Sequence, residues 1–198
     1  YDLTCSNQDM QVTKLAGLRT MELVTEEDEI GSAFYFRVNG VRIFGKGADF
    51  VPCDAMASCQ TEDVYEDLLD SAVEANMNML RVWGGGYYVD EQMYNACDEK
   101  GILIWQDFPF ACALYPASEE YLAEVEAEAK ENVLRISSHP SLALWCGNNE
   151  IWEGWGNWSW DKEVKDTDLA VKNYNTLFRE LIPNIVNEYC PTIDYTHS

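Results

Sequence analysis

The stretch MLRVWGGGYYVDEQMYNACDEKGILIWQD, residues 79–107, contains one complete repeat of the pattern that decides the fold. Residues 79–83 form a short apolar run, which is typical of a buried strand, and three glycines follow it. Residues 90–100 read as a helix that ends at Gly101, and 102–105 (ILIW) form a second apolar run. A helix between two such strands favours a parallel pair, because parallel strands require a long crossover connection.

The same alternation continues on both sides of this stretch. The further elements expected are a strand at 48–51, a helix at 61–75 capped by Thr61, a helix from Ser118 to His139-Pro140, a strand at 142–145, a helix at 168–189 with a kink or break at Pro183, and a fifth strand at 195–197. Four β/α units predict an α/β fold with a parallel sheet. A doubly wound sheet and a (β/α)₈ TIM barrel both fit, although no G-x-G-x-x-G motif supports dinucleotide binding. A whole barrel needs roughly 250 residues, so this chain would hold only the first half of one.

The first 45 residues read differently, as β structure without helices. Two runs rich in β-forming residues, 34–38 and 41–44, flank Asn39-Gly40. Asn-Gly between such runs is a strong signal for a two-residue hairpin turn. The chain therefore changes from an all-β segment to α/β repeats near Gly45.

Composition restricts the classes of partner. Hydrophobic residues make up 47% of the 198 residues, and 35 acidic against 13 basic residues give a net charge of −22. Such a surface repels nucleic acids and anionic membranes, whereas a neutral sugar would feel no penalty. No apolar run is long enough for membrane insertion, and no signal peptide is visible at Tyr1, so the compartment stays undefined.

Cysteines and tryptophans carry further expectations. The seven cysteines are odd in number and form no CxxC pair, so we expect neither a zinc site nor a dense disulfide framework. Five of the seven tryptophans lie close together: Trp145, Trp152, Trp155, Trp158 and Trp160. Sugar rings stack on indole faces, so this cluster favours carbohydrate binding.

The carboxyl ends of the expected strands carry the candidate site residues. These ends read DFVP (49–52), WGGGYY (83–88), WQDF (105–108) and WCGNNE (145–150). Function in parallel α/β folds concentrates at this edge of the sheet. Polar groups beside aromatic rings suit a sugar pocket, because hydroxyls take hydrogen bonds and the apolar sugar face takes the indole.

Each candidate also has a structural interpretation. Glu150 could be a helix-start carboxylate favoured by the dipole, Asp107 a loop cap, and Trp83 a core residue. The three glycines could form a loose turn or allow close approach of backbone to a ligand. His139 reads as structural because it lies at the opposite end of its strand, and the role of His197 stays open.

Four segments together resemble a known family: VNGVRIFGKGADFVPCD, ANMNMLRVWGGGYY, CDEKGILIWQDFPFACALYP and HPSLALWCGNNE. In this order and spacing they are similar to the β-mannosidases of glycoside hydrolase family 2, from about residue 18 to residue 198. Related β-galactosidases share the Asn-Glu pair but are less similar around the second and third strands. The resemblance implies an immunoglobulin-like sandwich for residues 1–30, of which only the last strands are present, and the N-terminal half of the catalytic TIM barrel for residues 31–198.

The resemblance also implies site residues. Glu150 matches the family's general acid/base, Asn149 the amide that binds the sugar 2-hydroxyl, and Trp83 a wall of the pocket for the terminal mannoside. Asp107 and Trp158 fall on or near the same rim. No metal or organic cofactor is implied.

The implied activity is retaining hydrolysis of terminal, non-reducing β-D-mannose residues on oligosaccharides or N-glycan cores. This mechanism needs a second carboxylate about 5–5.5 Å from the first, and the family's nucleophile lies beyond residue 198. We therefore expect the chain to depend on the remaining domains of the same enzyme and to be inactive alone. The alternatives are a non-catalytic carbohydrate-binding or structural module, or the same hydrolysis on β-galactosides or β-glucosaminides.

Overall fold

A five-stranded parallel sheet forms the centre of the computed structural model, which describes all residues from 1 to 198. Its strands are β6 (Gly47–Phe50), β7 (Met79–Val82), β8 (Leu103–Asp107), β9 (Leu142–Cys146) and β10 (Tyr195–Thr196). They lie in the order β10-β9-β8-β7-β6, and each pairs in parallel with its neighbour in the sequence. The predicted parallel α/β architecture and the fifth strand are confirmed.

Helices follow the strands as the sequence pattern predicts. They are α1 (Glu62–Glu74), α2 (Glu91–Lys100) and α3 (Glu119–Ile136), with a short 3₁₀ turn, η1 (Ala57–Cys59), before α1. Ser118 caps α3 by accepting the Tyr121 amide, and Gly101 ends α2 with φ +72°, both as predicted. Thr61 occupies the first cap position of α1, but its side chain makes no capping hydrogen bond.

The helix before β10 continues past Pro183 instead of breaking there. It consists of α6 (Thr167–Tyr174), a π-helical segment η2 (Asn175–Leu181) and α7 (Ile182–Tyr189). Proline lacks an amide proton and clashes with the carbonyl four residues earlier. The wider π turn changes the hydrogen-bond register just upstream of Pro183, so the chain absorbs the proline without a break.

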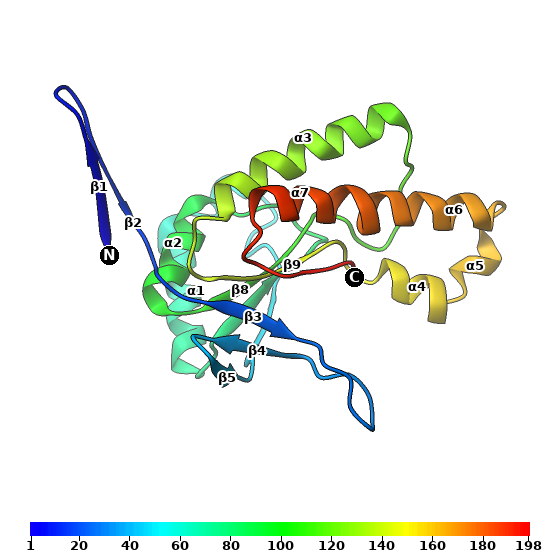
Figure 1. Cartoon of the computed structure of the whole chain (residues 1–198), viewed down its shortest axis with the longest axis horizontal. Coiled ribbons are helices and arrows are strands. Elements are labelled where there is room, and N and C mark those ends of the chain that lie inside the picture. The colour runs from blue at the N-terminus through cyan, green and yellow to red at the C-terminus, as the bar shows by residue number, and fades with distance from the viewer.

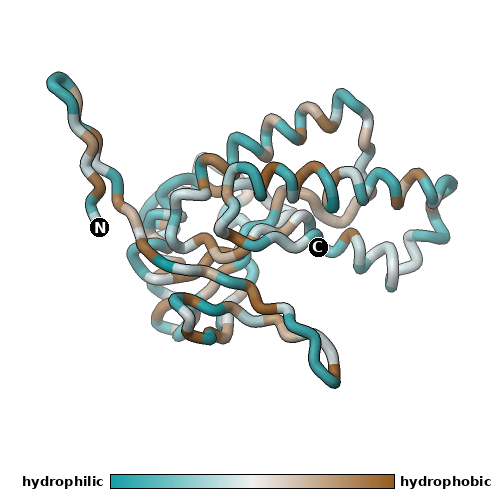
Figure 2. The backbone as a smooth tube through the Cα atoms, in the orientation of Figure 1, coloured by the Kyte–Doolittle hydropathy of each residue, from teal (hydrophilic) through white to brown (hydrophobic).

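Helices α3 and α7 lie side by side along the sheet (Figure 1). Val125, Ala129 and Val133, spaced four apart on α3, are all buried. Figure 2 shows the matching alternation of apolar and hydrophilic residues along both helices. Strand β9 lies under this layer, and all five of its residues are buried. The residues that follow β9 are therefore positioned by a strand of the core. No helix has the length and apolar character of a membrane span.

The N-terminal segment forms two antiparallel units. The hairpin of β1 (Asp2–Ser6) and β2 (Gln11–Leu15) projects from the body, and both of its strands are exposed (Figure 1). A three-stranded sheet follows, made of β3 (Met21–Val24), β4 (Tyr35–Val38) and β5 (Val41–Ile43). Asn39 and Gly40 turn the β4–β5 hairpin with φ of 50° and 78°, so the predicted hairpin is confirmed.

Strand β3 is tied to the parallel sheet by long-range hydrogen bonds. The Arg19 guanidinium donates to the carbonyls of Pro140 (3.1 Å) and Leu142 (2.7 Å), and the Leu23 amide donates to Asp194 (2.6 Å). Pairing of β3 with β4 crosses residue 30, the boundary expected between the sandwich strands and the barrel segment. Assignment of residues 1–30 to an immunoglobulin-like sandwich stays a prediction.

Candidate active site

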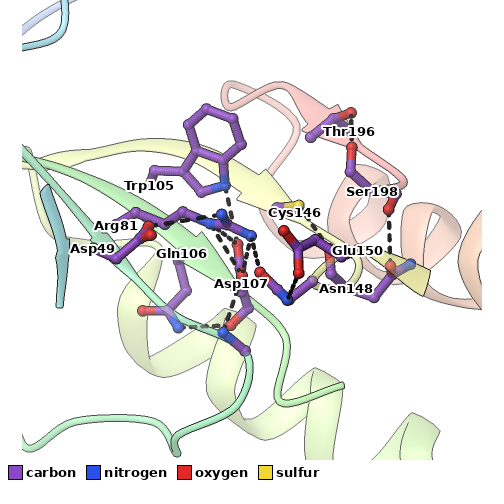
Figure 3. A network of polar contacts seen from close by, with 12 residues as sticks. Asp49, Arg81, Trp105, Gln106, Asp107, Cys146, Asn148, Glu150, Thr196 and Ser198 are labelled. Atoms are coloured by element: carbon purple, nitrogen blue, oxygen red, sulfur yellow. Dashed lines mark hydrogen bonds and ion pairs between the residues drawn. The ribbon is translucent and has the colours of Figure 1, made fainter. Parts of the chain in front are cut away.

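Polar side chains from three neighbouring strands meet at the carboxyl edge of the parallel sheet (Figure 3). Arg81 of β7 contacts both carboxylate oxygens of Asp107 at the end of β8, at distances from 2.7 to 3.1 Å. The same guanidinium donates to the side-chain oxygen of Asn149, which follows β9, at 3.0 Å. Asn149 donates in turn to Glu150 at 3.1 Å. A continuous chain of polar contacts therefore runs from β7 to the candidate acid/base.

Asp107 lies beneath this edge instead of on the expected rim. Its side chain is 0% exposed, and its oxygens also accept the Gly84 amide and the Trp105 indole N–H, each at 3.0 Å. Burial raises the pKa of Asp107, and the hydrogen bonds and charge of Arg81 act against that rise. Protein donors surround the carboxylate, so Asp107 holds Arg81, and its contact with a sugar stays a prediction.

Arg81 is the residue that sequence reasoning missed. Its guanidinium also lies 5.4 Å above the Trp105 ring and 3.6 Å from the exposed carboxylate of Asp49. A cation within the apolar run MLRVW was the available signal, because a charge in a buried strand requires a partner. The sequence alone does not say which acid fills that role.

Arg81 also fixes the orientation of the Asn149 amide. A guanidinium carries donors and no acceptor, so it must face the amide oxygen. The amide nitrogen of Asn149 then faces Glu150 and the sulfur of Cys112, 3.8 Å away. Asn149 is 4% exposed, whereas Glu150 is exposed. The buried amide thus presents an exposed carboxylate at the end of β9.

Glu150 has a strained backbone. Its φ and ψ are 59° and 14°, in the left-handed region, which costs roughly 1–2 kcal/mol for a residue with a Cβ. It stands at the cap position of α4 (Ile151–Asn157), but its side chain makes no capping hydrogen bond. Strained residues persist where the surroundings over-determine them, which is common at functional sites.

The three glycines after β7 shape the surroundings of Trp83. A Cβ on Gly85 would lie 2.0 Å from the Trp83 ring, and one on Gly84 would lie 2.8 Å from the Phe108 carbonyl. Gly84 thus lets the segment after β8 approach, and Gly85 leaves room for the indole. The glycines are therefore a tightly packed turn and not a loose one, and Trp83 is half-buried beside it.

The tryptophan cluster does not form one surface. Trp145 is fully buried and stacks on Phe108 at 5.2 Å between ring centroids, so it is a core residue. Trp158 is 45% exposed at the end of α4, next to α5 (Trp160–Glu163), and packs edge-on against Trp160. Hydrogen bonds join Asp107, through Arg81, to Asn149 and Glu150, whereas the aromatic contact of Trp158 is with Trp160.

The two histidines occupy opposite ends of the sheet. His139 is buried between Asp98 (2.7 Å) and Glu91 (3.1 Å), in agreement with a structural role. His197 follows β10, and its Nε2 accepts from the Arg179 guanidinium at 3.2 Å, so in the neutral ring Nδ1–H donates to the Tyr174 hydroxyl at 2.7 Å. Burial, assisted by the charge of Arg179, lowers the pKa of His197 and favours the neutral ring.

Comparison with solved structures first gives the fold. No protein-family model matches the chain. A β-glucuronidase from Parabacteroides merdae superposes with a TM-score of 0.72 over 98% of this chain and 22% of its own, at 21% identity. At that identity the similarity establishes the fold alone, which is the fold of a segment of glycosidases.

A narrower relationship follows from sequence identity. The β-D-mannosidase of Dictyoglomus thermophilum has a TM-score of 0.85 and 37% identity over 96% of this chain and 22% of its own. The β-mannosidase of Capra hircus is 45% identical over 176 residues, 86% of this chain and 20% of the relative. β-Mannosidase B of Aspergillus clavatus is 39% identical over 191 residues, 93% of this chain and 22% of the relative. The chain is homologous to a segment of the β-mannosidases that makes up about a fifth of their length.

Proposed function

We propose that the chain provides the acid/base half of the active site of a retaining β-mannosidase of glycoside hydrolase family 2. The observation that carries the proposal is the exposed Glu150 carboxylate, held at the end of β9 by the buried contacts of Asn149, Arg81 and Asp107. Homology to β-mannosidases over 86–95% of the chain supports the same assignment.

Glu150 would act twice in this mechanism. As an acid it protonates the glycosidic oxygen while a second carboxylate, contributed from outside this chain, attacks the anomeric carbon. As a base it then takes a proton from the water that hydrolyses the glycosyl-enzyme. An exposed carboxylate without a capping role can contact both the glycosidic oxygen and the attacking water.

Asn149 and Trp83 would bind the terminal mannose unit. The Asn149 oxygen is engaged by Arg81, so a sugar hydroxyl would take an Asn149 amide hydrogen that points to Glu150 or to the Cys112 sulfur in this structure. The half-buried Trp83 indole offers a ring face for stacking. We place Trp158 in an outer position, since it is 45% exposed and packs against Trp160 of α5.

We further propose that the five-stranded sheet is the first half of a (β/α)₈ barrel. Sequential parallel order is the order of barrel strands, and β6 and β10 have unpaired edges where the remaining strands would join. The exposed β1–β2 hairpin fits the last strands of a sandwich domain, because an isolated hairpin is marginally stable by itself. The substrate is then a terminal β-mannoside on an oligosaccharide, and the 198-residue chain alone would not turn over an aryl β-mannoside.

Replacement of Glu150 by alanine in the full-length enzyme tests the proposal. Cleavage of a mannose–mannose bond should nearly cease, because this poor leaving group needs a proton in the transition state. Dinitrophenyl β-mannoside departs unprotonated, so its first step should survive, give a burst and respond to azide. Glu153→Ala, in the first turn of the same helix, is the matched control. Equal losses on both substrates, without burst or azide effect, would contradict the acid/base assignment.

A further inference from the structure

Asn148 is a buried residue whose side-chain amide forms all of its hydrogen bonds within the protein. It is 0% exposed, and its amide oxygen accepts the Ile151 amide at 3.0 Å and the Ser198 hydroxyl at 2.9 Å. Its amide nitrogen donates to the His197 carbonyl at 2.6 Å and to the Tyr174 hydroxyl at 3.4 Å. Both donors and both acceptor positions of the amide are therefore used.

One of these bonds spans Glu150 along the chain. The contact from the Ile151 amide to the Asn148 oxygen closes a turn that contains Asn149 and Glu150. Glu150 takes the left-handed conformation inside this turn. An asparagine side chain that accepts an amide three residues ahead imitates a backbone turn and fixes the residues between.

The other bonds anchor this turn to the neighbouring strand. The contacts to His197 and Ser198 reach the chain just after β10, and Figure 3 shows Asn148 and Ser198 facing each other there. The turn that carries Glu150 is thus held from within by Ile151 and from outside by the end of β10. Arg81 and Asn149 act on Glu150 from the opposite side, through β7 and β8.

We infer that Asn148 is the positioning residue for Glu150: it sets the backbone conformation that aims the carboxylate at the glycosidic oxygen, without touching the substrate. The inference deepens the proposed function and rests on it. A misplacement of about 1 Å is enough to cost about 100-fold in rate, so loss of the turn should be visible in catalysis. The loss should be confined to steps in which Glu150 transfers a proton.

Two substitutions in the full-length enzyme separate the bond to Ile151, which closes the turn, from the bonds to His197 and Ser198, which anchor it to the end of β10. Asn148→Ala removes both of them, whereas Asn148→Ser retains a hydroxyl that can accept the Ile151 amide and gives up the bond to His197. Ser198→Ala removes one outer hydrogen bond to Asn148 and leaves the turn closed, and Glu153→Ala is the control outside both sets of bonds. Thermal unfolding of each variant accompanies the kinetics.

The expected result depends on the leaving group. For Asn148→Ala, kcat/KM on mannobiose should fall about 10- to 100-fold, while that on dinitrophenyl β-mannoside falls less than about threefold. Asn148→Ser should recover most of the mannobiose activity, Ser198→Ala should lose less than Asn148→Ala, and Glu153→Ala should behave as the parent. If Asn148→Ala fails to fold, the ratio of the kcat/KM values of Asn148→Ser on the two substrates decides. We then expect a loss on mannobiose that exceeds the loss on dinitrophenyl β-mannoside and is smaller than the mannobiose loss of Glu150→Ala.

A purely structural Asn148 gives a different pattern, with equal losses on both substrates that follow the fall in melting temperature. That result overturns the inference while Glu150→Ala still shows its own leaving-group selectivity. Uniform losses in both Asn148 and Glu150 variants instead reject the proposed acid/base role, and the inference with it.

Discussion

Replacement of Asp107 by alanine should destabilise the protein far more than any change on its surface. The substitution leaves the Arg81 guanidinium without the carboxylate that it contacts at 2.7 Å. It also leaves the buried Gly84 amide and the Trp105 indole N–H without the acceptor that they share. Three groups lose their partner at once, inside the region that holds Asn149.

The magnitude follows from the burial of the pair. Removal of one partner of a buried ion pair costs about 3–5 kcal/mol, because an uncompensated charge remains. Asp107 is 0% exposed, but the Arg81 side chain is 24% exposed and keeps Asp49 at 3.6 Å. Water and Asp49 therefore relieve part of the loss, and we expect a decrease of about 3 kcal/mol in the free energy of unfolding.

Urea unfolding followed by tryptophan fluorescence measures this decrease, and urea avoids the charge screening that guanidinium would add. Asp49→Asn is the matched control, because its carboxylate is 55% exposed and contacts the same guanidinium. It should cost less than about 1 kcal/mol. Equal, small effects of the two substitutions would show that Asp107 does not compensate the charge of Arg81.

Two further substitutions give separate readouts. Trp83→Ala in the full-length enzyme should weaken sugar binding by about 1–3 kcal/mol, by analogy with base–aromatic stacking; normal binding with a much lower melting temperature would instead make Trp83 a core residue. Burial alone lowers the pKa of His139, but the hydrogen bond to Asp98 and the charges of Asp98 and Glu91 raise it above 6.5 overall. Its stabilising contribution is therefore complete below the unfolded-state pKa and disappears as pH rises through the raised value. His139→Gln should flatten that decline in unfolding free energy as the pH rises above 6.5, and an unchanged slope would contradict it.

Much of the fold follows from short-range patterns. Apolar runs of four or five residues between helical stretches predicted the parallel strands, and Asn39-Gly40 predicted the hairpin. Helix α4 escaped prediction because its sequence, IWEGWGN, contains two glycines and no clear apolar period. Its conformation depends on tertiary contacts, including burial of Ile151 and the bond from Ile151 to Asn148.

The site was predictable in position but not in its contacts. Strand-end placement indicated the segment 145–150, and the resemblance to the β-mannosidases selected Asn149 and Glu150 within it. The pairing of Arg81 with Asp107 joins residues 26 positions apart, and only the register of β7 with β8 brings them together. A one-residue slip in that register would turn one of the two side chains to the other face, which no local pattern in the sequence specifies.

The strictly sequential strand order has a consequence for synthesis of the protein. Every strand of the parallel sheet pairs with the strand made just before it, so each β/α unit can add to a sheet that has already left the ribosome. The antiparallel sheet attaches to the parallel sheet later, because the Leu23 amide of β3 must wait for Asp194, which is 171 residues further along the chain. A segment that is made early is therefore among the last to bond to the parallel sheet, at the stage when β10 is made.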